Sequence, residues 1–133
     1  MFIDTTFCID LMRERHKRQK GPASTKLTEL GETPLFAAVF VICELQAGAR
    51  MAKNPLKELR KVEILSEKLE IVYPDSTFPI AYGEAEATLR SQGIPIPVMD
   101  LLIGVTAKTH GIPLLTRDTS HFKTIPDLVL EEY

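Results

Sequence analysis

The sequence predicts an α/β fold: a three-layer α/β/α sandwich with a central, mostly parallel sheet. Short apolar runs alternate along the chain with amphipathic helical patterns, and this alternation is typical of parallel strand pairing. Glycine or proline lies at several of the junctions between the two kinds of segment. The chain has 133 residues, a usual domain size, so we expect one domain over residues 1–133.

Five apolar runs are expected to form the strands. They cover residues 1–4, 35–39, 70–73, 113–116 and 129–130. Each run is short and bounded by capping or turn residues, as buried strands of parallel sheets are.

Helical patterns fill the intervals between these runs. We expect helices from about residue 6 to a stop at Gly21-Pro22, over 23–30, from 40 to about 52, over 56–69, from 74 to 93, and from 100 to 111. The helix that Asp100 opens is apolar on nearly every side between residues 101 and 106. Such a helix is expected to pack deep in the core.

Composition excludes several classes of protein. Hydrophobic residues make up 44% and charged residues 26%, which argues against disordered and fibrous chains. The net charge of −2 is not that of a strongly basic nucleic-acid binder, so local patches would have to carry any such role. Cys8 and Cys43 form neither a disulfide framework nor a zinc spacing. With no membrane-length apolar run and no basic leader, we expect a cytoplasmic protein that does not enter the membrane.

Four carboxylates are placed where a site would form. Asp4 and Asp118 each follow an apolar run, Glu44 lies in a helical pattern, and Asp100 opens the buried helix. Groups at the carboxyl ends of parallel strands converge on the crevice where ligands bind, so we expect these acids to meet.

An acidic cluster of this kind predicts a divalent metal. Two carboxylates about 4 Å apart repel by roughly 4 kcal/mol at an effective dielectric near 20, so the cluster must be protonated or hold a cation. Carboxylate and water ligands suit Mg²⁺ or Mn²⁺, and no Cys/His cluster argues for zinc. Such an ion polarises phosphoryl oxygens and activates water, which is the chemistry of phosphodiester hydrolysis.

The four segments together resemble the successive motifs of the PIN domain family, and within it the VapC-type toxins. The segments are Met1-Phe2-Ile3-Asp4-Thr5-Thr6, Glu44-Leu45-Gln46-Ala47-Gly48, Asp100-Leu101-Leu102-Ile103-Gly104-Val105-Thr106-Ala107 and Leu114-Leu115-Thr116-Arg117-Asp118-Thr119-Ser120-His121-Phe122. The resemblance covers nearly the whole chain, with the motifs in order. The chain departs from the family at Thr6, where Asn or Ser is frequent, and at Asp118, where VapC-type toxins often have Asn.

The resemblance implies a PIN-like nuclease domain: a Mg²⁺- or Mn²⁺-dependent endoribonuclease, paired with a small antitoxin protein and forming a homodimer. Its acidic positions carry over to Asp4, Glu44, Asp100 and Asp118. We expect Asp4 and Asp100 to be the principal metal ligands, directly or through water. Glu44 is then a further ligand or orients the attacking water, and Asp118 completes the pocket. One ion or two, and the identity of the RNA, are left open.

Each of these residues also has a structural interpretation. Asp100 could simply cap its helix, and Asp4 could be an ordinary loop residue. The basic run over residues 13–20 is either a solvated helix end, the favoured interpretation, or a contact for RNA phosphates. Arg117 either grips phosphate or pairs with a nearby carboxylate, and pairing is favoured.

The remaining chemistry-bearing side chains are expected to be structural. His121 is expected to pack a helix turn with Phe122, and Cys43 to be a small core residue. No nucleophile accompanies any histidine at a recognisable spacing.

Two other functions compete with the ribonuclease. The first is a catalytically silent PIN-like module that binds RNA or protein. The second is a phosphoacceptor receiver domain, whose doubly wound fold also gathers acids at strand ends. Receivers fit less well, because Arg117-Asp118 stands where they place a lysine after a late strand.

Overall fold

The computed structural model describes residues 1–133 and contains one five-stranded sheet whose strand pairs are all parallel. The strands are β1 (Phe2–Ile3), β2 (Phe36–Ala38), β3 (Glu70–Val72), β4 (Leu114–Leu115) and β5 (Leu130–Glu131). The predicted α/β class and parallel sheet are confirmed. Four strands are shorter than predicted, and the fifth is displaced by one residue.

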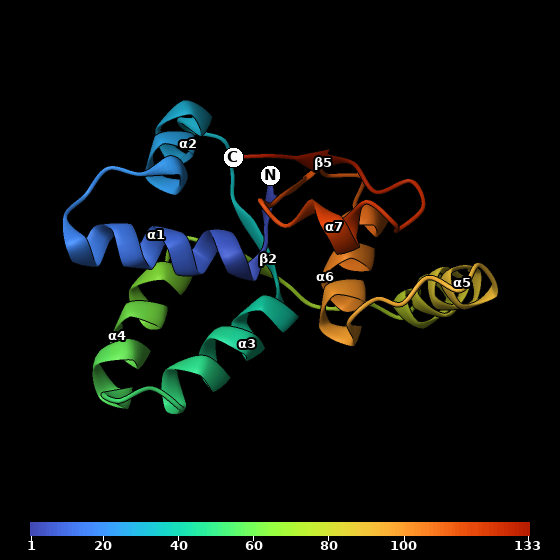
Figure 1. The fold of residues 1–133 in the computed structure, drawn as a ribbon, viewed down its shortest axis with the longest axis horizontal. Helices are drawn as coiled ribbons and strands as arrows, with labels where there is room; N and C mark the ends of the chain where they lie inside the picture. Colours follow the sequence, from blue (N-terminus) through green and yellow to red (C-terminus); the bar gives the residue numbers. More distant parts are fainter.

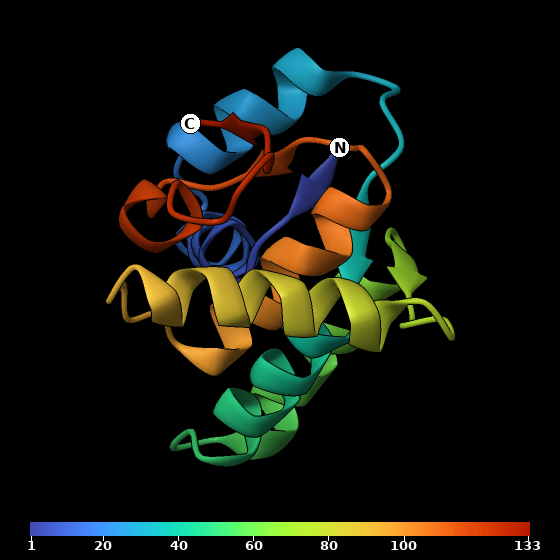
Figure 2. The same ribbon diagram turned by 90° about the vertical axis from the view of Figure 1, so that its right-hand side faces the viewer.

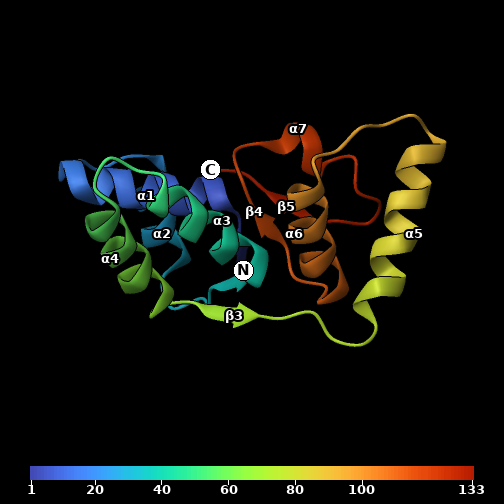
Figure 3. The same ribbon diagram turned by 90° about the horizontal axis from the view of Figure 1, so that it is seen from below.

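Seven helices connect and cover the strands. They are α1 (Thr5–Lys17), α2 (Pro22–Leu30), α3 (Val39–Arg50), α4 (Pro55–Ser66), α5 (Phe78–Ser91), α6 (Val98–Thr109) and α7 (Thr119–Phe122). Helices α1 to α4 lie on one side of the sheet, and α5 to α7 lie on the other (Figures 1 and 3). Figure 2 shows α5 as the outermost helix of its side, packed over α6.

The strand order, β3-β2-β1-β4-β5, places β1 at the centre of the sheet. Phe2 pairs with Phe36 on one side and with Leu114 on the other. The chain therefore leaves β1 toward β2 but later returns to the opposite side of β1 as β4. Ligands of open parallel sheets bind at such a reversal, beyond the carboxyl ends of the two strands.

The core is formed mainly by the central strands and the helix faces that cover them. Phe2, Ile3, Leu114 and Leu115 are fully buried. Helix α6 is buried along most of its length, as its apolar sequence predicts, and the C-terminal segment packs against it at Gly104.

Two sequence predictions about helix α3 and its flanks are wrong. Val39 begins α3 and does not extend β2, so the strand ends at Ala38. Cys43 is exposed and is not a core residue. The reason is helical geometry: Cys43 follows the buried Val41 by two residues, about 200° around the helix, and so faces solvent.

The start of α6 also differs from the prediction. The helix begins at Val98, after Pro97 as the N-cap residue, so Asp100 lies within the first turn and does not open the helix. No side chain caps this helix, and the capping interpretation of Asp100 is therefore wrong. The short helix α7 was not expected as a separate element.

Gly104 allows the close approach of the C-terminal segment to α6. A Cβ atom at this position would overlap with Cδ1 of Ile125 and lie 3.2 Å from Cδ2 of Leu128. Gly104→Ala should therefore lower the free energy of unfolding by about 1–3 kcal/mol, measured by urea denaturation. Gly83→Ala is the matched control, because it adds the same methyl group to α5 in open space. It should stabilise the protein by roughly 0.5–1 kcal/mol, and equal effects at both sites would contradict the close packing.

Candidate active site

The structure brings the four predicted carboxylates to one hollow beyond the carboxyl ends of β1 and β4. The hollow has a volume of about 150 Å³ and is lined by Asp4, Thr5, Thr6, Glu44, Asp100, Ile103, Asp118 and Phe122. The start of α1 and the first half of α3 approach α6 here, near the middle of Figure 1. Segments separated by more than a hundred residues thus supply one acidic surface.

Asp4 has the most constrained side chain of the four. It is 2% exposed and is the N-cap residue of α1, where one carboxylate oxygen, Oδ1, accepts a hydrogen bond from the Phe7 backbone N–H at 2.8 Å. The other oxygen, Oδ2, accepts from the hydroxyls of Thr6 (2.6 Å) and Thr116 (2.5 Å). The loop interpretation of Asp4 is therefore wrong, and three donors fix the orientation of its carboxylate.

Thr116 connects the ends of the two central strands, and sequence reasoning missed it. It is fully buried just after β4, donates to Asp4, and accepts a hydrogen bond from the Asp118 backbone N–H at 2.9 Å. The Asp118 carboxylate accepts from the Ser120 hydroxyl at 2.6 Å. A threonine two residues before the acid, at the end of an apolar strand, was the available sequence signal.

Glu44 enters the hollow from the first half of α3. Its side chain is half-buried, and Oε2 accepts a hydrogen bond from the hydroxyl of Thr5, the first residue of α1. Helices α1 and α3 pack against each other, so this contact holds Glu44 at the junction of the two.

Asp100 has a partner that the sequence did not indicate. Nδ1 of His121, on α7, lies 2.8 Å from Oδ2 of Asp100. Because an ionised carboxylate can only accept, Nδ1 carries the hydrogen in this contact. His121 therefore does more than pack a helix turn, and it orients a carboxylate of the hollow.

The carboxylates influence one another electrostatically. Burial raises the pKa of Asp4, the negative charge of Asp118 raises it further, and the three hydrogen bonds to its oxygens offset part of this rise. Burial also raises the pKa of Asp100, with contributions from Asp118 and Asp4, while His121 opposes the rise. The hollow thus disfavours its own negative charge, as expected where a cation belongs.

The donor set of the hollow fits a hard divalent cation that retains water. All its polar side-chain groups are carboxylates and threonine hydroxyls, which suit Mg²⁺ or Mn²⁺. No three His, Cys, Asp or Glu side chains are close enough to form a complete metal site by themselves. The volume admits several water molecules at about 30 Å³ each, and Mg²⁺ commonly keeps several of its waters in proteins.

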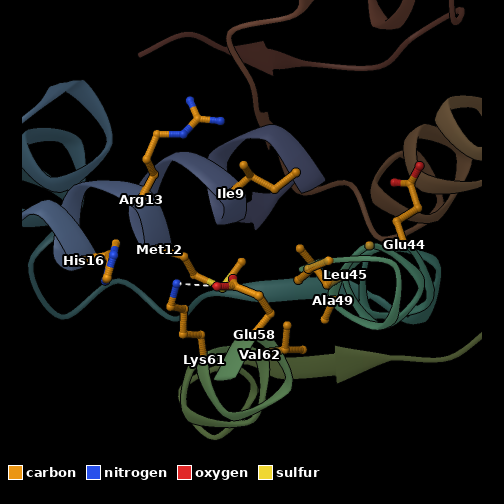
Figure 4. Close-up of a pocket in the computed structure, with 12 residues that line it drawn as sticks. Ile9, Met12, Arg13, His16, Glu44, Leu45, Ala49, Glu58, Lys61 and Val62 are labelled. Carbon is orange, nitrogen blue, oxygen red and sulfur yellow. Dashed lines mark hydrogen bonds and ion pairs between the residues drawn. The ribbon is translucent and has the colours of Figure 1, made fainter. Parts of the chain in front are cut away.

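An apolar groove adjoins the acidic hollow. It has a volume of about 390 Å³ and lies between α1, α3 and α4. In Figure 4, Met12, Leu45, Ala49 and Val62 point into it from the three helices, and the Glu58–Lys61 ion pair lies along one side. Glu44 lines both the groove and the hollow, so the two cavities share a wall.

Arg117 pairs with a carboxylate, as favoured from the sequence. Its Nε lies 3.1 Å from Oδ2 of Asp10. The residues of the basic run from Arg15 to Lys20 are exposed around the end of α1, as expected of a solvated helix end, and their contact with RNA stays a prediction.

The PIN domain family model matches residues 1–128, nearly the whole chain. This chain belongs to the PIN domain family. Membership excludes the receiver-domain alternative and confirms the resemblance seen in the sequence.

None of the helices has the length and hydrophobicity needed to span a bilayer.

Relatives within the PIN domain family include VapC proteins. The chain is 30% identical to "Ribonuclease VapC1" of Haemophilus influenzae strain R2866, over 98% of this chain and 96% of that protein. Among solved structures, VapBC2 from Rickettsia felis, bound to a promoter DNA fragment, superposes with a TM-score of 0.89 at 26% identity, covering 99% and 97% of the two chains. VapBC-1 from nontypeable Haemophilus influenzae superposes with a TM-score of 0.84 at 28% identity, covering 98% and 96%.

The pKa of Asp4 generates a stability prediction for the metal-free protein. The pKa of Asp4 in the folded protein lies above its ordinary value of 3.8. Asp4 therefore contributes stability to the fold below pH 3.8, and this contribution is lost as the pH rises through the pKa of the folded protein. Asp4→Asn removes the charge and keeps the side-chain shape, so in EDTA the variant should be more stable than the wild type at neutral pH. The difference should shrink toward pH 4 in a denaturation series.

Asp75→Asn is the control of opposite sign. Asp75 is exposed near the start of α5, and hydrogen bonds from Thr77 hold its pKa below the ordinary value. Its replacement should lower stability at neutral pH. An Asp4→Asn variant that is less stable than the wild type at every pH would show that the hydrogen bonds to the ionised carboxylate outweigh its burial.

Proposed function

We propose that this PIN domain is a metal-dependent endoribonuclease that hydrolyses RNA phosphodiester bonds, and that it is the toxin of a type II toxin–antitoxin pair. The observation that carries the proposal is the hollow in which Asp4, Glu44, Asp100 and Asp118 meet. The names of the relatives support it: ribonuclease for the Haemophilus protein and VapBC complexes for the neighbouring structures.

The proposed roles follow from how each side chain is held. Asp4 and Asp100 would hold Mg²⁺ or Mn²⁺ directly or through water, since burial, together with the neighbouring carboxylates, raises their pKa values and a cation would favour their ionised forms. The ion would supply Lewis acidity toward the scissile phosphate and a more acidic water. Glu44 would be a further ligand or would orient the attacking water, and Asp118 would complete the pocket. The buried Ile103 and Phe122 limit the entry of bulk water.

The antitoxin would occupy the apolar groove between α1, α3 and α4. Its volume and apolar lining suit a segment of another protein, and Glu44 in its wall places such a segment next to the acidic hollow. A bound antitoxin would thereby keep RNA from the site. The homodimer also stays a proposal, and Leu56 of α4 and Ile80 of α5 are largely exposed apolar side chains that a second copy could cover.

RNA cleavage by the purified protein tests the ribonuclease directly. With Mg²⁺ or Mn²⁺ the wild type should cut cellular RNA, and EDTA should stop it. Asp4→Asn and Asp100→Asn should each lower the rate by about 100-fold or more, because each removes charge needed to stabilise the transition state. Glu84→Gln, an exposed change of equal charge on α5, is the control. Full activity in both aspartate variants would show that the site is misassigned. The absence of any metal-dependent product would favour the silent binding module.

His121 should act as a positioning residue through Asp100. His121→Ala removes the donor that orients Asp100 and should weaken Mn²⁺ binding, measured by calorimetry, by about 10–100-fold, as is usual for such partners of metal ligands. His121→Asn keeps an N–H near the position of Nδ1 and should recover part of the affinity. Equal Mn²⁺ affinity in the wild type and the alanine variant would reduce His121 to a packing residue.

A further inference from the structure

Asp10 holds two arginines that come from separate parts of the chain. Its side chain is 10% exposed and contacts three groups. Oδ1 accepts a hydrogen bond from Nη1 of Arg13 at 3.2 Å, and Oδ2 accepts one from the Tyr133 hydroxyl at 3.0 Å. Oδ2 also lies 3.1 Å from Nε of Arg117. A single carboxylate thus brings together guanidinium groups from α1 and from the loop after β4.

Both arginines keep most of their hydrogen-bonding capacity. Each side chain is 55% exposed. The ion pair with Asp10 is the sole polar contact of the Arg117 side chain, and it leaves both terminal amino groups without a partner. A guanidinium that served only to pair with a carboxylate would be expected to use its two-pronged edge, with two parallel hydrogen bonds. The geometry at Asp10 instead fixes each arginine through one nitrogen and leaves the others facing solvent.

The space beside these arginines is concave and can admit a ligand group. A hollow of about 180 Å³ is lined by Asp10, Arg13, Glu14, Pro22, Arg117 and Tyr133. Glu14 is a second carboxylate of this hollow, and its oxygens accept hydrogen bonds from the Ala23 and Ser24 backbone N–H groups at the start of α2, where the positive end of the helix offsets part of its charge. Arg13 also lines the apolar groove, and in Figure 4 its guanidinium points away from Met12, Leu45 and Ala49.

Arg117 is next in the sequence to two residues of the acidic site. Arg117 stands between Thr116, which holds Asp4, and Asp118, which lines the acidic hollow. Four carboxylates repel the phosphates that flank a scissile bond, so a bound RNA needs cationic groups close by. Guanidinium groups match the geometry of a phosphate with paired N–H donors.

We propose that Arg117 and Arg13, oriented by Asp10, form a binding site for an RNA backbone phosphate next to the cleaved bond. The proposal rests on the proposed ribonuclease function and assigns substrate-binding residues outside the acidic hollow. Asp10 restricts the rotation of both side chains before RNA binds, which lowers the entropy cost of binding. Arg117 is then a substrate-binding residue, and its pairing with Asp10 is what positions it.

The salt dependence of RNA binding tests the assignment. Binding of a fluorescently labelled single-stranded RNA is measured by anisotropy in EDTA over a range of salt concentrations. Each lost phosphate contact on a single strand lowers the slope of log affinity against log salt by about 0.7. Arg117→Gln and Arg13→Gln should each show this decrease, with affinity reduced several-fold. Arg117→Lys keeps the charge and should retain the slope while binding more weakly.

Arg90→Gln is the matched control, because Arg90 is an exposed, ion-paired arginine on α5, on the other side of the sheet. It should leave the slope unchanged.

Cleavage kinetics in Mn²⁺ give a second readout: the Arg117 and Arg13 variants should raise KM with little change in kcat. If Arg117→Gln proves unstable in thermal denaturation, Arg13→Gln and Arg117→Lys carry the test.

Each outcome separates this proposal from the ribonuclease proposal. The salt slopes of the Arg117→Gln and Arg13→Gln variants could equal that of Arg90→Gln while the wild type still cleaves RNA. This result would overturn the phosphate site alone. A lowered slope in a protein that cuts no RNA would support the phosphate site and overturn the nuclease. Wild-type RNA binding without salt dependence would overturn the phosphate site, whatever the cleavage result.

Discussion

The buried carboxylate of Asp4 is the group on which the candidate site depends. It caps α1, so the helix begins directly after β1, and it accepts a hydrogen bond from Thr116, so the ends of β1 and β4 are held together. A carboxylate buried to this extent needs several donors, because desolvation disfavours its charge. The hydroxyls of Thr6 and Thr116 and the Phe7 N–H meet that need. The same contacts place an acidic group beside Asp100 and Asp118.

Two cavities with different chemistry meet at Glu44. The polar side-chain groups of the smaller cavity are all carboxylates and hydroxyls, whose oxygen atoms can bind a metal ion. The larger cavity is mainly apolar. Glu44 comes from α3 and is held by Thr5 of α1, so the wall between the cavities depends on the packing of these two helices. Whatever fills the groove therefore lies beside the acidic hollow. If the groove holds the proposed antitoxin, inhibition requires no long-range conformational change.

Much of the fold could be predicted because the sequence pattern is strong. The five strands and their alternation with helices could be predicted because buried segments are apolar, and apolar runs are visible in the sequence. Strand ends and helix starts were less predictable, since Val39 has a high β propensity but begins α3. The apolar neighbours of Cys43 suggest burial, whereas the helix turns its side chain outward. The four acids could be predicted from their motifs. Thr116 and His121 could not, because their roles depend on contacts across the fold.

The central position of β1 has a consequence for the order in which the molecule is completed. Phe2 pairs with Leu114, so the middle strand lacks one neighbour until synthesis has passed residue 114. Pairing between such distant segments is slow, because closing a long loop costs conformational entropy before any stabilising contact forms. The acids after β1 and β4 can meet only at that late stage. A nascent chain on the ribosome therefore carries these acidic residues apart.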